Sequence, residues 1–362
     1  MGPLKRVVFL GSGDVGHRSL ELLLRAARGG HGGGFEVSLA VTHGPQKQGR
    51  GMKLVPSRVA GLAADAGVGV STLSARSDEF LEQFAALRPD LAITAAFGQM
   101  LPQSFLDVPT YGTLNIHPSL LPRWRGAAPV QRSLQAGDGV AGVSVARTVL
   151  ALDAGPLLAQ RRVALRGDEH APELLLELFE QGTQDLVDTL GGVWRAGAQH
   201  GNVSSGADGS SASAAYAALG MEQDEAGVTV ARKVRKGDGE VCFGEHAAAA
   251  VHNNVRAFSG WPGTSVVLKR GKKTQRVKLI ATRRQPRDGS CASPAAAAAG
   301  GGGGGIDIPG IGELRGDALR VACADGEVLE VLELQPVGKA VMSARDFCNG
   351  VRGGNASWAT ES

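Results

Sequence analysis

The chain has 362 residues, of which 43% are hydrophobic and 20% charged, a balance that excludes general disorder and favours two folded domains. No apolar run reaches the roughly 20 residues of a membrane-spanning helix, and the four cysteines show neither a Cys-x-x-Cys pair nor metal-site spacing. The net charge is only +3, but residues 229–287 hold 14 Lys or Arg against three acidic residues. This segment predicts a polyanion-binding region and favours a folded RNA over a membrane.

Residues 1–195 are predicted to form an α/β domain, because short apolar strands alternate with amphipathic helices. The repeated β-α-β units imply a Rossmann-like, doubly wound and mostly parallel sheet, with an active crevice at the carboxyl ends of its strands. The expected strands cover residues 7–10, 37–41, 91–97, 113–117 and 143–149. The expected helices cover residues 18–28, 57–66, 80–87, 128–135 and 172–190, and a polar loop is expected at 43–53.

A linker is predicted at residues 196–227, because Gly, Ala and Ser dominate most of that stretch. Residues 228–355 then show only short strand patterns, which predicts a smaller, mainly-β, OB-like barrel that carries the basic charge. Residues 292–305 include five alanines followed by six glycines, and this low-complexity tract is expected to be a surface insertion. The expected barrel strands are 228–230, 264–268, 275–281, 318–322 and 328–334.

Gly11, Gly13 and Gly16 match the G-x-G-x-x-G pattern of a dinucleotide-binding turn and stand between an expected strand and an expected helix. Such a site also needs an acidic residue at the far end of the second strand, where it binds a ribose. That position offers Thr42 and His43 instead. The pattern therefore favours a tight strand-to-helix turn and leaves nicotinamide binding as the alternative.

Asn115 and His117 are the first candidates for chemistry. In an extended strand, residues two apart share one face and lie about 7 Å from each other. Pro118 restricts His117 to extended backbone and ends the strand ladder, so an amide and an imidazole stand together at a strand end. Asn and protonated His can both donate to a developing oxyanion, which suits an acyl-type transfer. Either residue could instead be structural, as a turn-forming Asn or a hydrogen-bonded core His.

Asp153 is the third candidate, in the turn Leu152-Asp-Ala-Gly-Pro156 that follows an expected strand. A carboxylate beside His117 would orient the imidazole ring and favour its charged form. The alternative is a turn residue that accepts a hydrogen bond from its own backbone. Asn115, His117 and Asp153 together, in this order and this fold, indicate a site more strongly than any one of them.

The run NIHPSLLP at 115–122, followed by LDAGP at 152–156, resembles the 10-formyltetrahydrofolate-dependent formyltransferases. Within that superfamily, SLLPRWRGAAPVQR at 119–132 is similar to the branch that acts on methionyl-tRNA. The resemblance covers nearly the whole chain outside the linker and the Ala/Gly tract. Further support comes from the segments 49–54, 230–236 and 335–347.

The resemblance implies roles for particular residues. Asn115, His117 and Asp153 match the catalytic residues of the family, and no metal ion is implied. The folate side would be lined by Ser119, Leu120, Leu121 and Pro122. The tRNA would be bound by Arg50 and Lys53 in a loop that enters the acceptor stem, and by Lys233, Lys236 and Lys339 in the second domain.

The resemblance also implies the reaction, which is transfer of the formyl group of 10-formyltetrahydrofolate, a co-substrate, to the methionine of initiator methionyl-tRNA in translation initiation. The partners would be that tRNA and tetrahydrofolate, without a membrane, and the enzyme is expected to be a monomer. The Ala/Gly tract is typical of GC-rich eukaryotic genomes, so a mitochondrion or plastid is expected, with the cytoplasm as the alternative. Two functional alternatives stay open: a formyltransferase that acts on another amine, and a non-catalytic RNA-binding protein.

Overall fold

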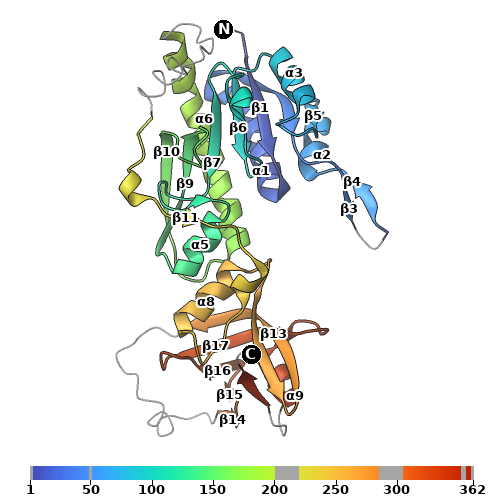
Figure 1. Ribbon diagram of the computed structural model, residues 1–362, viewed down its shortest axis with the longest axis vertical. Helices are drawn as coiled ribbons and strands as arrows, with labels where there is room; N and C mark the ends of the chain where they lie inside the picture. The colour runs from blue at the N-terminus through green and yellow to red at the C-terminus, as the bar shows by residue number, and fades with distance from the viewer. Residues whose placement is uncertain (1–2, 49–50, 200–219, 285–304, 352–355, 360–362) are drawn as a thin grey trace. The chain divides into compact units, whose positions relative to one another are not determined.

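The computed structural model describes residues 3–48, 51–199, 220–284, 305–351 and 356–359 (Figure 1). The chain divides into two compact units, each built around its own sheet. Unit 1 comprises residues 1–129, 140–164 and 173–232. Unit 2 comprises residues 130–139, 165–172 and 233–362.

Unit 1 contains one seven-stranded, mostly parallel sheet, whose strands are β1 (Lys5–Gly11), β2 (Phe35–Val41), β5 (Gly69–Ser71), β6 (Leu91–Ala95), β7 (Thr113–His117), β9 (Val140–Arg147) and β10 (Leu157–Ala164). The strand order is β10-β9-β7-β6-β1-β2-β5. The strands from β7 to β5 run parallel, whereas β9 is antiparallel to both of its neighbours. The predicted doubly wound α/β fold is confirmed, with one antiparallel strand in addition.

One face of this sheet is covered by α3 (Asp78–Ala86) and α4 (Gln103–Leu106). Phe84 on α3 stacks on Phe105 of α4 at 4.4 Å between ring centroids, and both belong to the same core cluster as Val8 and Leu10 of β1. Alternate residues of a strand point to opposite faces, so the apolar run of β1 supplies side chains to both layers.

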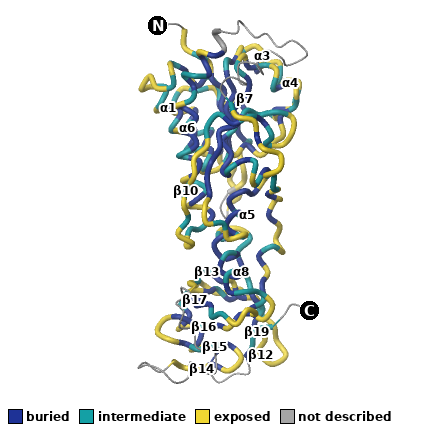
Figure 2. Tube along the Cα trace, turned by 90° about the vertical axis from the view of Figure 1, so that its left-hand side faces the viewer, coloured by how far each residue is buried: buried dark blue, intermediate teal, exposed yellow. Residues whose placement is uncertain are grey.

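The other face is covered by α1 (Gly13–Arg28) and α6 (Ala171–Gln199), and α2 (Arg58–Asp65) packs beside α1. The hydroxyl of Thr183 on α6 donates to the hydroxyl of Ser19 on α1 at 3.0 Å, in the buried contact between the two helices. Gly182 allows α6 to approach the sheet, since a Cβ atom there would lie 2.4 Å from Val143 of β9 and 2.7 Å from Ile116 of β7. β7 is buried between the layers (Figure 2).

The glycines of the turn between β1 and α1 are explained by close packing and by backbone conformation. A Cβ atom on Gly16 would lie 2.9 Å from the carbonyl carbon of Gly11, and Gly13 has a φ of +64°. The far end of β2 leads to Thr42, whose hydroxyl is hydrogen bonded to Ser57. The turn therefore needs glycine for close helix-to-strand packing, and the contacts favour that interpretation over nicotinamide binding.

Unit 2 contains an eight-stranded antiparallel sheet with the strands β12 (Thr264–Arg270), β13 (Lys273–Arg284), β14 (Ile306–Ile308), β15 (Gly312–Arg315), β16 (Ala318–Ala322), β17 (Val328–Pro336), β18 (Met342–Ser343) and β19 (Ala356–Ala359). The strand order is β14-β15-β16-β17-β13-β12-β19, and β18 pairs with β17. The sheet curls until its two ends meet, where Trp358 N donates to Gly310 O at 3.3 Å. α8 (Ala248–Ala257) and α9 (Ala344–Val351) pack on it, and the predicted β-rich second fold is confirmed.

The segment between the two folds does not follow the predicted boundaries. α6 continues through residues 196–199, and residues 200–219 of the predicted linker lie outside the described residues. Residues 220–232 belong to unit 1, where β11 (Val230–Ala231) pairs in parallel with β8 (Arg125–Gly126). The barrel strand expected at 228–230 is therefore wrong, because its backbone bonds are made to unit 1. The Ala/Gly tract at 292–304 also lies outside the described residues.

Candidate active site

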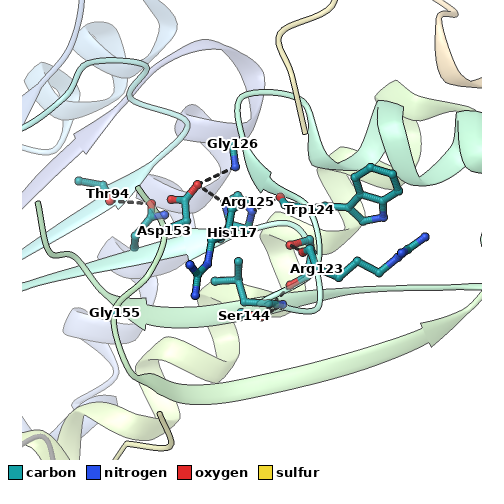
Figure 3. A network of polar contacts seen from close by, with 12 residues as sticks. Thr94, His117, Arg123, Trp124, Arg125, Gly126, Ser144, Asp153 and Gly155 are labelled. Atoms are coloured by element: carbon teal, nitrogen blue, oxygen red, sulfur yellow. Dashed lines mark hydrogen bonds and ion pairs between the residues drawn. The ribbon is translucent and has the colours of Figure 1, made fainter. Parts of the chain in front are cut away.

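Asn115 lies near the carboxyl end of β7, and the neighbouring strand fixes the direction of its amide. Thr94 of β6 is its partner in the parallel register, and the Thr94 hydroxyl donates to Asn115 Oδ1 at 2.7 Å (Figure 3). Because the carbonyl end of the amide is occupied, Nδ2 is the end that can donate to a substrate. Ile116 packs towards α6, so Asn115 and His117 project together from the opposite face.

His117 is the last residue of β7 and its side chain is buried, with 4% of the residue exposed. Its Nε2 atom lies 2.9 Å from the carbonyl oxygen of Trp124. Since a carbonyl oxygen only accepts, Nε2 carries a hydrogen. Nδ1 lies 3.7 Å from Asp153 Oδ2, which is longer than a hydrogen bond (Figure 3). Nδ1, when protonated, is therefore the imidazole atom that can donate to a substrate oxygen.

Asp153 reaches the same place from the loop between β9 and β10, as its sequence position predicts. Its Oδ2 atom accepts a hydrogen bond from Gly126 N at 2.9 Å (Figure 3). Asp153 has a φ of +50° and Trp124, on the other side of His117, has a φ of +64°. A left-handed conformation costs residues with a Cβ about 1–2 kcal/mol each, and such strain tends to gather at functional sites. The backbone on both sides of the imidazole is thus held in specialised conformations.

The segment predicted to line the folate side is tied to β9 and β10. The Ser119 hydroxyl donates to Arg123 O at 2.7 Å, and Ser119 O accepts from the hydroxyl of Ser144, which stands opposite His117 in the register. Leu121 N donates to Ser144 Oγ, and Leu121 O accepts from Gln160 at 2.9 Å. Ser119 and Leu121 are buried and shape this loop from inside, whereas the other two predicted residues, Leu120 and Pro122, are half-buried.

Several residues around this site had no role in the sequence prediction. Thr94 is the single polar side chain of the strand LAITA, and that isolation near a strand end was an available signal. Arg125 and Gln223 are buried and hydrogen bonded to each other at 2.8 Å. Gln223 stands in the predicted linker, where a polar residue is ordinary, so no sequence signal distinguished it.

The basic residues predicted to bind tRNA are spread over both units. The predicted loop at 43–53 overlaps a hairpin of β3 (Gln46–Gln48) and β4 (Lys53–Val55), which extends away from the sheet of unit 1 (Figure 1). Lys53 is exposed on β4, next to Leu54 with 67% exposure, and Arg50 lies outside the described residues. The other three predicted contacts, all exposed in unit 2, are Lys233, Lys236 and Lys339.

The described parts of the chain also bear on metal binding, membrane insertion and thiol chemistry. Within them, no group of three or more His, Cys, Asp or Glu residues is arranged to hold a metal ion. Among the same residues, no helix has the length and apolar character needed to cross a membrane. Burial raises the pKa of the Cys323 thiol to about 12, so that thiol stays protonated and is a poor nucleophile.

An α/β sheet with Asn, His and Asp at its carboxyl edge fits a group-transfer enzyme. Comparison with known protein families identifies the class. Residues 5–190 match the family model for formyl transferase. Residues 233–352 match the model for the formyl transferase C-terminal domain. The chain belongs to the formyltransferase family.

Relatives of known activity define the branch. The methionyl-tRNA formyltransferase of Roseobacter denitrificans is 36% identical over 346 residues, which cover 95% of each chain. The methionyl-tRNA formyltransferase of a Methylobacterium species is 34% identical over 348 residues, which cover 96% of each chain. Within its family, the chain therefore belongs to the methionyl-tRNA formyltransferases, and the predicted resemblance is confirmed.

Solved structures share the fold. The N-formyltransferase of Helicobacter canadensis, solved with folinic acid and dTDP-3-aminofucose, has a TM-score of 0.58 at 14% identity, covering 92% of this chain and 100% of that chain. HypX of Aquifex aeolicus, solved with tetrahydrofolic acid, has a TM-score of 0.56 at 18% identity, covering 97% of this chain and 48% of that chain. At these identities the likeness shows the architecture alone.

Proposed function

We propose that this chain transfers the formyl group of 10-formyltetrahydrofolate to the α-amino group of methionine on initiator methionyl-tRNA. One observation carries the proposal: Asn115, His117 and Asp153 meet at the carboxyl edge of the sheet in a chain that belongs to the methionyl-tRNA formyltransferases. Ligands of doubly wound sheets bind at that edge. The folate is a substrate, and the protein supplies orientation and charge stabilisation.

The reaction needs donors for a negative charge on the formyl oxygen. The methionine amine attacks the formyl carbon, and a pair of C=O electrons moves onto the oxygen. When this tetrahedral intermediate collapses, the bond from the formyl carbon to folate N10 breaks. Asn115 Nδ2, whose direction Thr94 sets, and a protonated His117 Nδ1 are the donors that we assign to the oxyanion. Donors placed in advance act without a reorganisation cost during the reaction.

The reaction also moves one proton from the attacking amine to folate N10. We assign this transfer to Asp153, acting through water, because its carboxylate faces the imidazole and lies 3.7 Å from Nδ1. The carboxylate balances the charge of the imidazolium and is regenerated when N10 takes the proton. Gly126 N–H holds Oδ2 in place during these steps.

This scheme predicts how the rate depends on pH. The amine attacks only when it is unprotonated, and α-amino groups have pKa values of about 7.7–8.0. The scheme also needs a protonated His117, so between pH 6 and pH 8 the kcat/KM for methionyl-tRNA is expected to rise as the neutral amine forms and to decline only where the imidazolium is lost, as measured by initial rates in buffers of constant ionic strength. A rate that falls steadily over that interval would contradict an attacking neutral amine.

The tRNA is held through its phosphates, in our proposal, by the exposed cations of both units. Lys53 is on the β3–β4 hairpin, with Arg50 beside it in the sequence. Lys233 and Lys236 lie at the start of unit 2 and Lys339 lies on an exposed turn after β17. Such contacts position the RNA without reading its sequence.

The test is transfer of labelled formyl from 10-formyltetrahydrofolate to methionyl-initiator-tRNA. Glycinamide ribonucleotide and water serve as competing acceptors. Label is expected on the methionyl-tRNA alone, and His117→Ala is expected to lower the rate by about 10²–10³-fold, as for loss of one oxyanion donor. Label on another acceptor would retain the folate chemistry and reject the tRNA assignment. No transfer from folded protein that binds tRNA would favour a non-catalytic RNA-binding protein.

Three finer points belong to the same proposal. We propose that initiator methionyl-tRNA is preferred over the elongator, that the active form is a monomer, and that the protein acts in a mitochondrion or plastid. The last point is supported by the Ala/Gly tract, which is typical of GC-rich eukaryotic genomes. The ratio of kcat/KM for the two tRNAs, sedimentation of the purified chain and imaging of the tagged gene product in cells test them in turn.

A further inference from the structure

Residues 220–231, here called the strap, run along the two loops that flank His117. At one end, Met221 and Leu157 exchange both backbone hydrogen bonds at 2.8 Å, next to the Asp153 turn. At the other end, Arg125 N donates to Thr229 O and Trp124 N donates to the Thr229 hydroxyl. The strap therefore touches the loop that carries Asp153 and the loop that bonds the imidazole.

Gln223 is the strap residue that contacts the Asp153 turn. Its Nε2 group donates to two backbone carbonyls, Asp153 O at 2.8 Å and Gly155 O at 2.7 Å. Its Oε1 atom accepts from Arg125 Nε at 3.1 Å and from Arg125 Nη2 at 2.8 Å. With 9% of its surface exposed, Gln223 is buried; its bonds to Arg125 and to Gly155 O are buried, and its bond to Asp153 O is partly buried.

Arg125 determines which way the Gln223 amide faces. A guanidinium group only donates, so it must meet the oxygen end of the amide, and the NH2 end is then directed at the Asp153 turn. Arg125 is itself buried, with 8% exposure, and its other partner is Glu225, whose side chain is 74% exposed. A reversed Gln223 amide would leave a buried cation facing two donors.

The Asp153 turn needs such support because its backbone is unfavourable by itself. Asp153 has a φ of +50°, a conformation that residues with a Cβ adopt rarely. The carboxylate above that backbone accepts from Gly126 N at 2.9 Å and lies 3.7 Å from His117 Nδ1. A small rotation of the turn would change both distances, and with them the position of the carboxylate.

We propose that Gln223, oriented by Arg125, is a positioning residue of the formyl transfer: it holds the Asp153 turn so that the carboxylate stands against His117. The proposal rests on the proposed function, because it requires Asp153 to act in the transfer. Gln223 lies outside contact with the reacting atoms and acts through Asp153 alone. Its removal is therefore expected to lower kcat more than it changes KM.

The first variant is Gln223→Glu, which keeps an oxygen for Arg125 and replaces the amide donor by an oxygen that repels both carbonyls. We expect kcat to fall by about 10–100-fold, as for misplacement of a reacting group by about an ångström. We expect KM for both substrates to change by less than about threefold. Glu225→Ala is the matched control, because it removes the exposed partner of Arg125 and leaves Gln223 in place, and its kcat should stay within about twofold of wild type.

The decisive comparison combines Gln223→Glu with Asp153→Ala. If Gln223 acts through Asp153, the double variant is expected to be no slower than Asp153→Ala alone, since the two residues work as one unit. Losses that multiply would overturn the proposal and assign Gln223 a purely structural role. Wild-type turnover by Asp153→Ala would instead reject the catalytic assignment in the proposed function, so the two failures are distinguishable.

If Gln223→Glu folds poorly, a second variant tests the same proposal. Gln223→Met has the same chain length, adds no charge and lacks both donors. Its kcat is measured per folded molecule, with the folded fraction taken from circular dichroism and the tRNA Kd from filter binding. A lowered kcat at unchanged Kd supports positioning, and an unchanged kcat per folded molecule overturns it.

Discussion

Two side-chain amides at the candidate site have a fixed orientation, because in each of them the oxygen atom accepts a hydrogen bond from a neighbouring residue. Thr94 donates to Asn115 Oδ1, and Arg125 donates to Gln223 Oε1. In both cases the NH2 end is left for the group to which we assign it, the formyl oxygen of the proposed reaction for Asn115 and the Asp153 turn for Gln223. Substitutions that retain the shape and exchange NH2 for oxygen are therefore more informative than truncations.

Asn115→Asp tests the direction of the first amide. The carboxylate keeps an acceptor for Thr94 but turns a negative oxygen towards the developing oxyanion. Its turnover is expected to fall by at least about 10²–10³-fold, as low as that of Asn115→Ala. Thr94→Val should lose only about tenfold, because a neutral hydrogen bond contributes about 0.5–1.5 kcal/mol. Single-turnover rates of the folded proteins provide the comparison, and a faster Asn115→Asp than Asn115→Ala would reject Nδ2 as the donor.

At the scale of elements, the site depends on how closely α6 lies on the strands that carry it. Gly182 faces Ile116 of β7 and Val143 of β9, so the helix backbone rests against the strand next to Asn115 and His117. The same helix bonds to α1 through Thr183 and Ser19. The position of β7 is thereby determined from the face opposite to the side chains of Asn115 and His117.

Gly182→Ala should disturb that contact. Its Cβ would lie 2.4 Å from Val143 Cγ2, and overpacking of this kind costs about 1–3 kcal/mol, more than the roughly 1 kcal/mol that alanine gains in a helix. Gly191→Ala on the same helix is the control, because its nearest neighbour is the flexible end of Arg195 at 3.6 Å. Chemical denaturation should show a loss for the first variant and a small gain for the second. Equal effects would mean that α6 adjusts freely.

His252 on α8 provides a pH test of unit 2. Its Nε2 donates to Gly167 O, and its Nδ1 is bonded to the Thr282 hydroxyl at 2.8 Å. Burial lowers the pKa of His252 below its usual value near 6.5, and the positive charges of Arg256, Arg284 and His170 lower the pKa further. The unfolded chain therefore binds more protons than the folded chain below about pH 6.5, so the free energy of unfolding falls as the pH drops from there towards the folded pKa.

The measurement is the melting temperature at pH 7.0 and at pH 5.5. His252→Gln removes the titrating group, so the variant should show a smaller drop than the wild type between these values. Equal drops in the two proteins would assign the acid sensitivity to other groups.

For the whole molecule, the small net charge conceals two kinds of cation in the basic segment. Three arginines pair with glutamates inside unit 2, namely Arg276 with Glu240, Arg283 with Glu330 and Arg284 with Glu327. The lysines of the same segment are exposed, on β12, β13 and the turn between them or at the start of the unit: Lys233, Lys236, Lys269, Lys272, Lys273 and Lys278. The lysines are therefore the better candidates for phosphate contacts.

Salt dependence tests that division. Lys233→Gln and Lys236→Gln should each weaken tRNA binding and lower the slope of log K against log salt by about 1, the effect of one lost phosphate contact. Arg28→Gln is the control, because this exposed residue ends α1 at the sheet edge opposite the site. Filter binding between 50 and 200 mM salt is suitable. If the slope of log K against log salt is unchanged in both lysine variants, the tRNA phosphates do not contact Lys233 or Lys236.

Local patterns were sufficient for much of this protein. Strand periodicity and the turn glycines predicted the α/β sheet, and a two-residue spacing before a proline placed Asn115 and His117 on one face. The strand expected at 143–149 is present as β9, but its antiparallel direction was not predicted, because a strand's direction depends on the connection that precedes it and not on its composition. The prediction of a barrel strand at 228–230 was wrong for a related reason, since Val230 pairs with Arg125, which lies 105 residues away in the sequence.

The sequence by itself determined the two fold classes, the family and the trio of candidate catalytic residues, because these follow from short-range spacing and from motifs. The tertiary structure alone decided which end of each amide is occupied, and that His117 is bonded through Nε2 to Trp124 O and turns Nδ1 towards Asp153. It also decided that Gln223, 70 residues from Asp153, holds its turn. These facts depend on hydrogen bonds between distant segments, and the sequence does not show which buried donor will meet which acceptor.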